Sequence, residues 1–165
     1  MRILINFLSI SLFFSCTQYR VYQKVLKSTD PDFQYTQALN YFDDKDYVKS
    51  LQLFEDLLTK FKGHDKSEEI YYHFIYSNFY LQDYVSTVYH AKNFISRFIV
   101  SKKREEIEFL SAYCAYLESP RSSLDQKKTH LAIDALESFL INYPKSDSLN
   151  RVNSLIFELN NKLEK

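Results

Sequence analysis

The sequence repeats itself with a step of 37 residues, and this period limits the possible folds more than any other feature. Residues 68–70 (Glu-Glu-Ile) return at 105–107, and residues 46–48 (Asp-Tyr-Val) return at 83–85. The third unit contains an insertion, because Tyr143 follows its match in the second unit by 45 residues. A period of this length is typical of repeat proteins, in which every unit packs on its neighbours.

Within each unit the apolar residues recur at helical spacing, so the sequence predicts a pair of α-helices per unit. One start signal is Asp30-Pro31, an N-cap residue followed by proline at the first helical position. The predicted helices span residues 31–44, 46–61, 66–81, 83–98, 102–118, 129–142 and 147–163. A generic bundle of three helix pairs is the alternative, but the fixed period favours a solenoid.

The first unit resembles the tetratricopeptide (TPR) pattern, since Ala38, Tyr41, Tyr47 and Phe54 occupy positions of that pattern. The third unit has Ala132 at the small-residue position, and the second unit matches less well. The resemblance implies an all-α, right-handed TPR-like solenoid of about three helix pairs plus a C-terminal helix. That last helix could cap the array or be the first half of a fourth repeat. Its apolar stripe consists of Leu149, Val152, Ile156, Leu159 and Leu163.

The N-terminal residues have the pattern of an export signal. An apolar run from Ile3 to Phe14 follows Arg2. Its twelve residues would reach only ~18 Å as a helix, against ~30 Å for the hydrocarbon core of a bilayer, which favours a secretory signal peptide over a membrane span. The run ends at Ser15-Cys16, which resembles a bacterial lipobox and predicts lipidation of Cys16 by acyl chains such as palmitate. A plain signal peptide with a chance cysteine is the alternative.

These signals divide the chain into three parts. Residues 1–15 are the predicted lipoprotein signal peptide, 16–30 a lipidated tether, and 31–165 the TPR-like helical repeat domain. The tether is expected to be flexible because residues 17–30 show no amphipathic pattern. Signal and anchor together place the folded body outside the cytoplasm and against a membrane.

The composition excludes several classes of function. Gly63 is the only glycine, whereas phosphate-binding loops and dinucleotide fingerprints need several. The 21 Lys and Arg balance the 21 Asp and Glu, unlike the basic excess of nucleic-acid-binding proteins. The four histidines show no metal-ligand spacing, and Cys114 stands in an apolar stretch as a small buried hydrophobe. We therefore expect a protein that is not an enzyme and that has no cofactor, metal or nucleic-acid partner.

Two stretches resemble one particular family. Residues 116–146 read YLESPRSSLDQKKTHLAIDALESFLINYPKS, and residues 22–30 read YQKVLKSTD. Both resemble BamD-type (YfiO) outer-membrane protein assembly lipoproteins of the Bacteroidota kind, in the third repeat and in the N-terminal tether respectively. Family members usually have about five repeats, so this chain is expected to be short at its C-terminus.

The resemblance implies a lipid-anchored scaffold on the periplasmic side of the outer membrane. It would act in the β-barrel assembly machinery beside a BamA-like barrel subunit with POTRA domains, and would bind unfolded outer-membrane proteins before their insertion. The alternative function is a general envelope TPR adaptor lipoprotein that joins folded partners.

The TPR register also predicts a peptide-binding groove, because it places the first helix of each pair on the concave face. Positions at steps of 37 form three rows: Tyr35, Tyr72 and Phe109; Leu39, Tyr76 and Tyr113; and Phe42, Phe79 and Tyr116. Eight of these nine are aromatic, which suits extended segments that carry aromatic residues, as barrel strands do. Packing between helices is the alternative role, although other residues fill the predicted core: Phe74, Phe94, Leu110 and Phe139.

Overall fold

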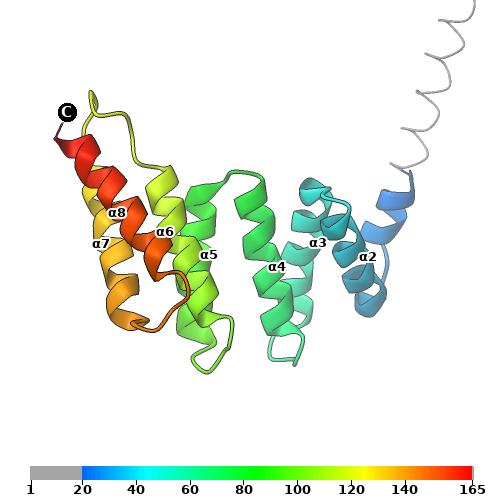
Figure 1. Ribbon diagram of the computed structural model, residues 1–165. Helices are drawn as coiled ribbons and strands as arrows, with labels where there is room; N and C mark the ends of the chain where they lie inside the picture. The colour runs from blue at the N-terminus through cyan, green and yellow to red at the C-terminus, as the bar shows by residue number, and fades with distance from the viewer. Residues whose placement is uncertain (1–19, 165) are drawn as a thin grey trace, which may run out of the picture. The chain divides into compact units, whose positions relative to one another are not determined.

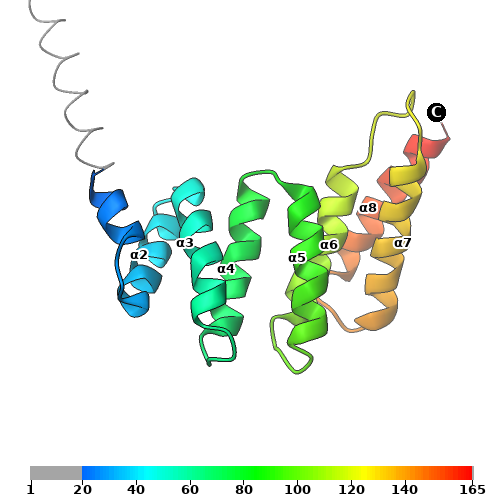
Figure 2. The same ribbon diagram turned by 180° about the vertical axis from the view of Figure 1, so that it is seen from behind.

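The computed structural model describes residues 20–164, and every regular element in that range is an α-helix (Figures 1 and 2). The helices are α2 (Pro31–Asp43), α3 (Tyr47–Lys60), α4 (Ser67–Tyr80), α5 (Tyr84–Arg97), α6 (Arg104–Leu117), α7 (Lys127–Asn142) and α8 (Leu149–Leu163). In this range no helix combines the length and the apolar character needed to cross a bilayer. The predicted signal peptide, 1–15, and Cys16 lie outside the described residues.

The predicted helices are confirmed to within two residues at each end, and so is the all-α, TPR-like fold class. The start of α2 shows one of the predicted signals in the structure. The Asp30 carboxylate accepts hydrogen bonds from the backbone amides of Asp32 and Phe33, and Pro31 takes the first helical position. A side chain that binds the free amides of the first turn fixes the start of a helix locally.

The turn within a helix pair is built twice in the same way. Lys45 and Gln82, which stand 37 residues apart, both adopt φ of 62°, in the left-handed region. The amide of the next residue, Asp46 or Asp83, binds a carbonyl five residues earlier and thereby closes the first helix. The carboxylate of the same aspartate then caps the second helix. Because neither left-handed residue is glycine, each turn costs about 1 kcal/mol of strain.

The described residues form two compact units, the first ending at His73 and the second beginning at Phe74, so the boundary falls inside α4. In the first unit α2 and α3 pack as a pair around Leu53, Phe54 and Leu57, which are fully buried. Ala38 of α2 is also fully buried, and its small side chain allows the two helices to approach closely.

In the second unit α6 packs against both α5 and α7, and α8 packs on α7. Three residues of α8 are buried: Val152, Leu155 and Leu159. Each stands 45 residues after a buried residue of α6, namely Ile107, Leu110 and Cys114. Since 45 is the step of the third unit, α8 occupies the place of the first helix of a further pair.

The structure adds one residue to the predicted stripe of α8. Leu155, which the sequence analysis left out, is 7% exposed, and Ile156 is partly buried and packs against the same core. Neighbouring residues differ by about 100° around a helix, so both residues fit the apolar spacing. The position of α7 decides which side chain is covered more fully.

The prediction of a flexible tether is wrong for residues 20–26. Residues 20–26 are helical, and Tyr22 and Val25 are 7% and 2% exposed. The Tyr22 hydroxyl donates to Oε1 of Gln52 at 2.6 Å, and the buried Gln34 amide donates to the carbonyls of Val25 and Leu26. Within the first unit this segment is therefore docked on α2 and α3.

Candidate functional site

The nine residues of the predicted groove divide between the two units. Four lie in the first unit: Tyr35, Leu39, Phe42 and Tyr72. Five lie in the second unit: Tyr76, Phe79, Phe109, Tyr113 and Tyr116. All nine are half-buried, so each packs against its neighbours and still presents part of its surface to solvent.

The five residues of the second unit are connected ring to ring, with Tyr113 at the centre. On α6 the Tyr113 ring is stacked with Phe109 and Tyr116 at centroid distances of 6.1 and 5.9 Å and interplanar angles of 12°. Phe79 of α4 lies 6.4 Å from Tyr113 and 6.3 Å from Tyr76. Phe109, Tyr113 and Tyr116 are three or four residues apart and so share one face of α6. We call these three residues the aromatic ladder.

Helix α8 adds two charged groups to the ladder. The Arg151 guanidinium lies over the rings of Phe109 and Tyr113, at 5.3 and 4.8 Å from their centroids. The Tyr116 hydroxyl donates to Oε2 of Glu158 at 2.6 Å. This hydrogen bond, together with burial, raises the pKa of Tyr116 to about 12, so the hydroxyl stays protonated at neutral pH. The ladder is thus held at one edge by a cation and a carboxylate.

On α4 the same surface is widened by a residue outside the predicted rows. Tyr80 is 45% exposed and its ring lies 5.9 Å from Tyr76 and 5.5 Å from Phe79. The Tyr76 hydroxyl donates to the carboxylate of Glu106 on α6. Exposed aromatic area therefore continues from α6 to the end of α4 that lies in the second unit.

In the first unit the predicted residues pack differently. Phe42 lies 6.4 Å from the buried ring of Phe54 and 4.9 Å from His73. Tyr72 also packs on the His73 ring, at 5.3 Å. Tyr35 packs instead on Phe61, at 6.4 Å, and burial raises its pKa. Phe42 and Tyr72 are thus linked through the His73 ring, and Tyr35 packs apart from them on Phe61.

The arrangement in the second unit suits the binding of a ligand. Within residues 20–164, no three His, Cys, Asp or Glu side chains are placed to share a metal ion. Cys114 is fully buried, and burial raises the pKa of its thiol to about 12, so at neutral pH it is not a nucleophile. Stacked rings with a fixed cation and carboxylates offer apolar area and polar partners to a ligand.

Three residues of this surface were missed by the sequence analysis: Tyr80, Arg151 and Glu158. A signal existed for Glu158, because it stands 45 residues after Tyr113, the step that relates α8 to α6. Tyr80 follows Tyr76 by one helical turn, which would have found it as well. Arg151 has no such signal, since its position over the ladder depends on how α8 packs.

The comparisons with known proteins agree with the helical repeats and with the resemblance of the third unit. The family model YfiO, described as outer membrane lipoprotein, matches residues 27–165. This range contains α2 to α8 and every residue of the candidate surface. A search of curated protein sequences finds no match.

Proposed function

The chain belongs to the YfiO family of outer membrane lipoproteins, and from this premise we propose that it is a scaffold of outer-membrane protein assembly. In this proposal the aromatic surface of the second unit binds extended segments of unfolded outer-membrane proteins. The observation that supports it most is the connected set of half-exposed rings around Tyr113.

The chemistry of the surface fits such a ligand. Strands of outer-membrane barrels alternate apolar and polar residues and carry aromatic residues at the membrane interfaces. Tyrosine rings offer broad contact area with little side-chain entropy to lose on binding. The ligand's backbone and polar side chains would find hydrogen-bonding partners in Arg151 and Glu158.

The proposal includes the place of the protein in the cell. Lipidation at Cys16 would anchor the chain in the outer membrane, with its helical units on the periplasmic side. There it would work beside a BamA-like barrel subunit with POTRA domains. Its role is that of a non-enzymatic scaffold that holds a ligand without changing it.

A binding measurement tests the function. A fluorescein-labelled peptide from the last strand of a barrel protein should bind in the micromolar range, roughly −8 kcal/mol, because ordering a flexible peptide offsets much of the contact energy. Combining Tyr76→Ala with Tyr113→Ala should weaken binding by about tenfold or more, since central residues dominate an interface. Fluorescence anisotropy gives the dissociation constants, and circular dichroism checks that the helix content is unchanged.

Tyr89 provides the matched control. It is a tyrosine of the same unit, 63% exposed, on α5 and outside the aromatic surface. Tyr89→Ala should leave the dissociation constant unchanged. Equal binding by wild type and the Tyr76 and Tyr113 double variant would remove this surface from the mechanism, and the adaptor that joins folded partners would then be the better account.

A further inference from the structure

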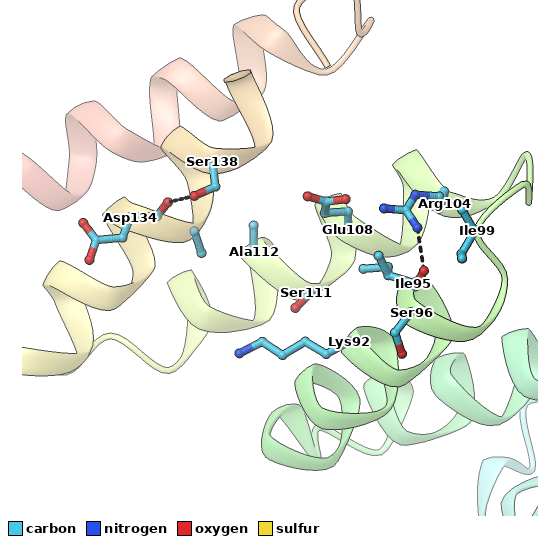
Figure 3. A pocket seen from close by; sticks show the side chains of 11 residues that line it. Lys92, Ile95, Ser96, Ile99, Arg104, Glu108, Ser111, Ala112, Asp134 and Ser138 are labelled. Atoms are coloured by element: carbon cyan, nitrogen blue, oxygen red, sulfur yellow. Dashed lines mark hydrogen bonds between the residues drawn. The ribbon is translucent and has the colours of Figure 1, made fainter. Parts of the chain in front are cut away.

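The second unit has another concave surface, a groove between α5 and α7 whose floor is α6 (Figure 3). Two adjoining hollows of about 660 and 320 Å³ make up the groove, and they share Lys92, Ser111 and Ala135. Helices α5 and α7 each pack extensively on α6, which separates them. None of the aromatic ladder residues lines these hollows, so the groove follows a different stripe of α6.

The floor of the groove is made of small side chains and its walls are aliphatic. Ser111, Ala112 and Ala115 of α6 form the floor. Apolar wall residues come from α5, from the turn that follows it and from α7, and include Val85, Val88, Ile95, Ile99 and Leu131. Three of them are strongly exposed: Val85 at 69%, Ile99 at 72% and Leu131 at 55%. Exposed aliphatic side chains along both sides of one hollow mark a docking surface.

Four charged side chains at the two ends of the groove are engaged within the unit. Lys128 and Glu118 form an ion pair at 2.7 Å. Arg104 donates to the backbone carbonyl of Ile95, and Glu108 accepts hydrogen bonds from two residues at the end of α7. Because these four side chains already have partners within the unit, they do not determine which charge a ligand must carry.

Two other charged residues line the groove. Lys92 projects from α5 along the floor, and Asp134 lies on α7 at the rim of the opposite wall, with its carboxylate directed away from Lys92 (Figure 3). Among residues 20–164 neither charged head group has an ion-pair or hydrogen-bond partner. The groove thus has a free cation on its floor and a free carboxylate at the rim of the α7 wall.

The aliphatic side chains of the walls favour a helical ligand over an extended peptide. An extended peptide would bring backbone amide and carbonyl groups against Val88, Ile95 and Leu131, which cannot hydrogen-bond to them. A helix satisfies its own backbone groups and can lie close to a floor of small residues. Because α5 has 14 residues, the groove has room for a helix of about four turns, ~21 Å long.

We propose that this groove binds one amphipathic α-helix of a partner protein. Its aliphatic side chains lie against α6, an acidic residue on one flank faces Lys92, and a basic residue on the other flank faces Asp134. The proposal is independent of the aromatic surface, and both surfaces can be occupied at once.

Two synthetic helices serve as probes. Each has about 14 residues and a lactam-stapled leucine face. The first carries glutamates on one flank and glutamines on the other, and the second carries lysines in place of the glutamates. The full chain is held in lipid nanodiscs, with empty nanodiscs as the blank, and anisotropy of the labelled probe gives the dissociation constant.

The expected result is a crossover between two charge variants. Lys92→Glu should weaken the acidic helix about fivefold and spare or strengthen the basic one, because an attraction becomes a repulsion. Asp134→Lys should do the reverse. Filling the floor by Ser111→Trp should weaken both helices at least tenfold. Leu131→Glu, at an exposed wall position, repeats this test if Ser111→Trp changes the helix content.

Several outcomes would overturn the proposal. One is wild-type affinity for both helices in Ser111→Trp and in Leu131→Glu, and another is no binding of either helix to the wild type. A proline-containing, non-helical peptide of the same composition that binds equally well would also contradict it. Sedimentation that shows a wild-type dimer, lost in both groove variants, would assign the groove to a second copy of this chain instead.

Discussion

Gln34 holds the helical segment 20–26 against the first unit, and its removal should release that segment alone. The side chain is fully buried, and Nε2 donates to the carbonyls of Val25 and Leu26 at 3.1 and 3.2 Å. Its Oε1 accepts from Nζ of Lys60 at 2.7 Å. One amide therefore connects the segment, α2 and α3.

The size of the effect follows from these three bonds. In Gln34→Ala the Val25 carbonyl keeps a bond from the amide of Ser28, and Lys60 can turn toward water or toward Asp56. The main loss is thus the pair of bonds to the segment, each contributing about 0.5–1.5 kcal/mol. We expect docking to weaken by about 2 kcal/mol, which corresponds to an opening equilibrium about 30-fold larger.

Limited trypsin digestion measures this opening, because Lys24 and Lys27 lie in the segment or directly after it and are exposed. Cleavage of a transiently open state follows its equilibrium population when closing is fast. Gln34→Ala should therefore be cut at these two lysines about 30-fold faster than wild type, with unchanged cutting at Lys49 in α3. Gln37→Ala, three residues further along α2, is the matched control and should behave as wild type.

Wild-type cutting rates at Lys24 and Lys27 in Gln34→Ala would refute this reasoning. They would mean that burial of Tyr22 and Val25 holds the segment without the amide. Equal acceleration at Lys49 would refute it in another way, since the whole unit would then open together.

Two other predictions concern α8 and the anchor. Leu159→Ala removes three fully buried carbons, so urea denaturation should show an unfolding free energy about 3 kcal/mol lower, at ~0.8 kcal/mol per carbon plus the cavity. The exposed Asn153→Ala should change it by less than about 0.5 kcal/mol, and equal effects of the two would mean that α8 is not packed. Mass spectrometry of the membrane-extracted protein should find an acylated N-terminal Cys16, and Cys16→Ser should move the protein to the soluble fraction. A Cys16→Ser protein that still sediments with membranes would contradict the anchor.

Three helices carry local start signals, whereas α6, α7 and α8 begin without a side-chain cap. Asp30, Asp46 and Asp83 cap the helices that follow them, and each capping bond spans only two or three residues of sequence. The repeat of 37 residues then predicted the positions of the helices in the next pair. A local start or stop signal begins or ends a helix at the same residue wherever that helix packs. Such a signal can therefore be recognised in the sequence without the tertiary structure.

Features set by distant contacts could not be predicted in this way. The segment 20–26 has no amphipathic pattern, and its order depends on Gln34, on Gln52 and on burial of Tyr22 and Val25. Sequence patterns that report one helix face cannot show that a buried amide will bind two carbonyls from another segment.

The candidate site depends both on local sequence patterns and on contacts between distant segments. The rows of aromatic residues follow from the repeat, but the repeat does not say which rings join into one surface. In the second unit Phe79, Tyr113 and Tyr116 are linked by ring contacts, whereas in the first unit Phe42 packs on the buried Phe54.

Helix α8 changes the chemistry of the surface at the next position of each row. The residues 45 positions after Phe109, Tyr113 and Tyr116 are Ser154, Glu158 and Asn161, so the rows become polar where α8 takes the place of a first helix. Glu158 accepts from Tyr116 and Arg151 lies over Phe109 and Tyr113, which places both charges at the border of the rings. A ligand on this surface therefore meets aromatic area on α4 and α6 and charge on α8. Under the proposed function, the aromatic side chains of the ligand would contact Tyr76 and Tyr113, and its polar groups would contact α8.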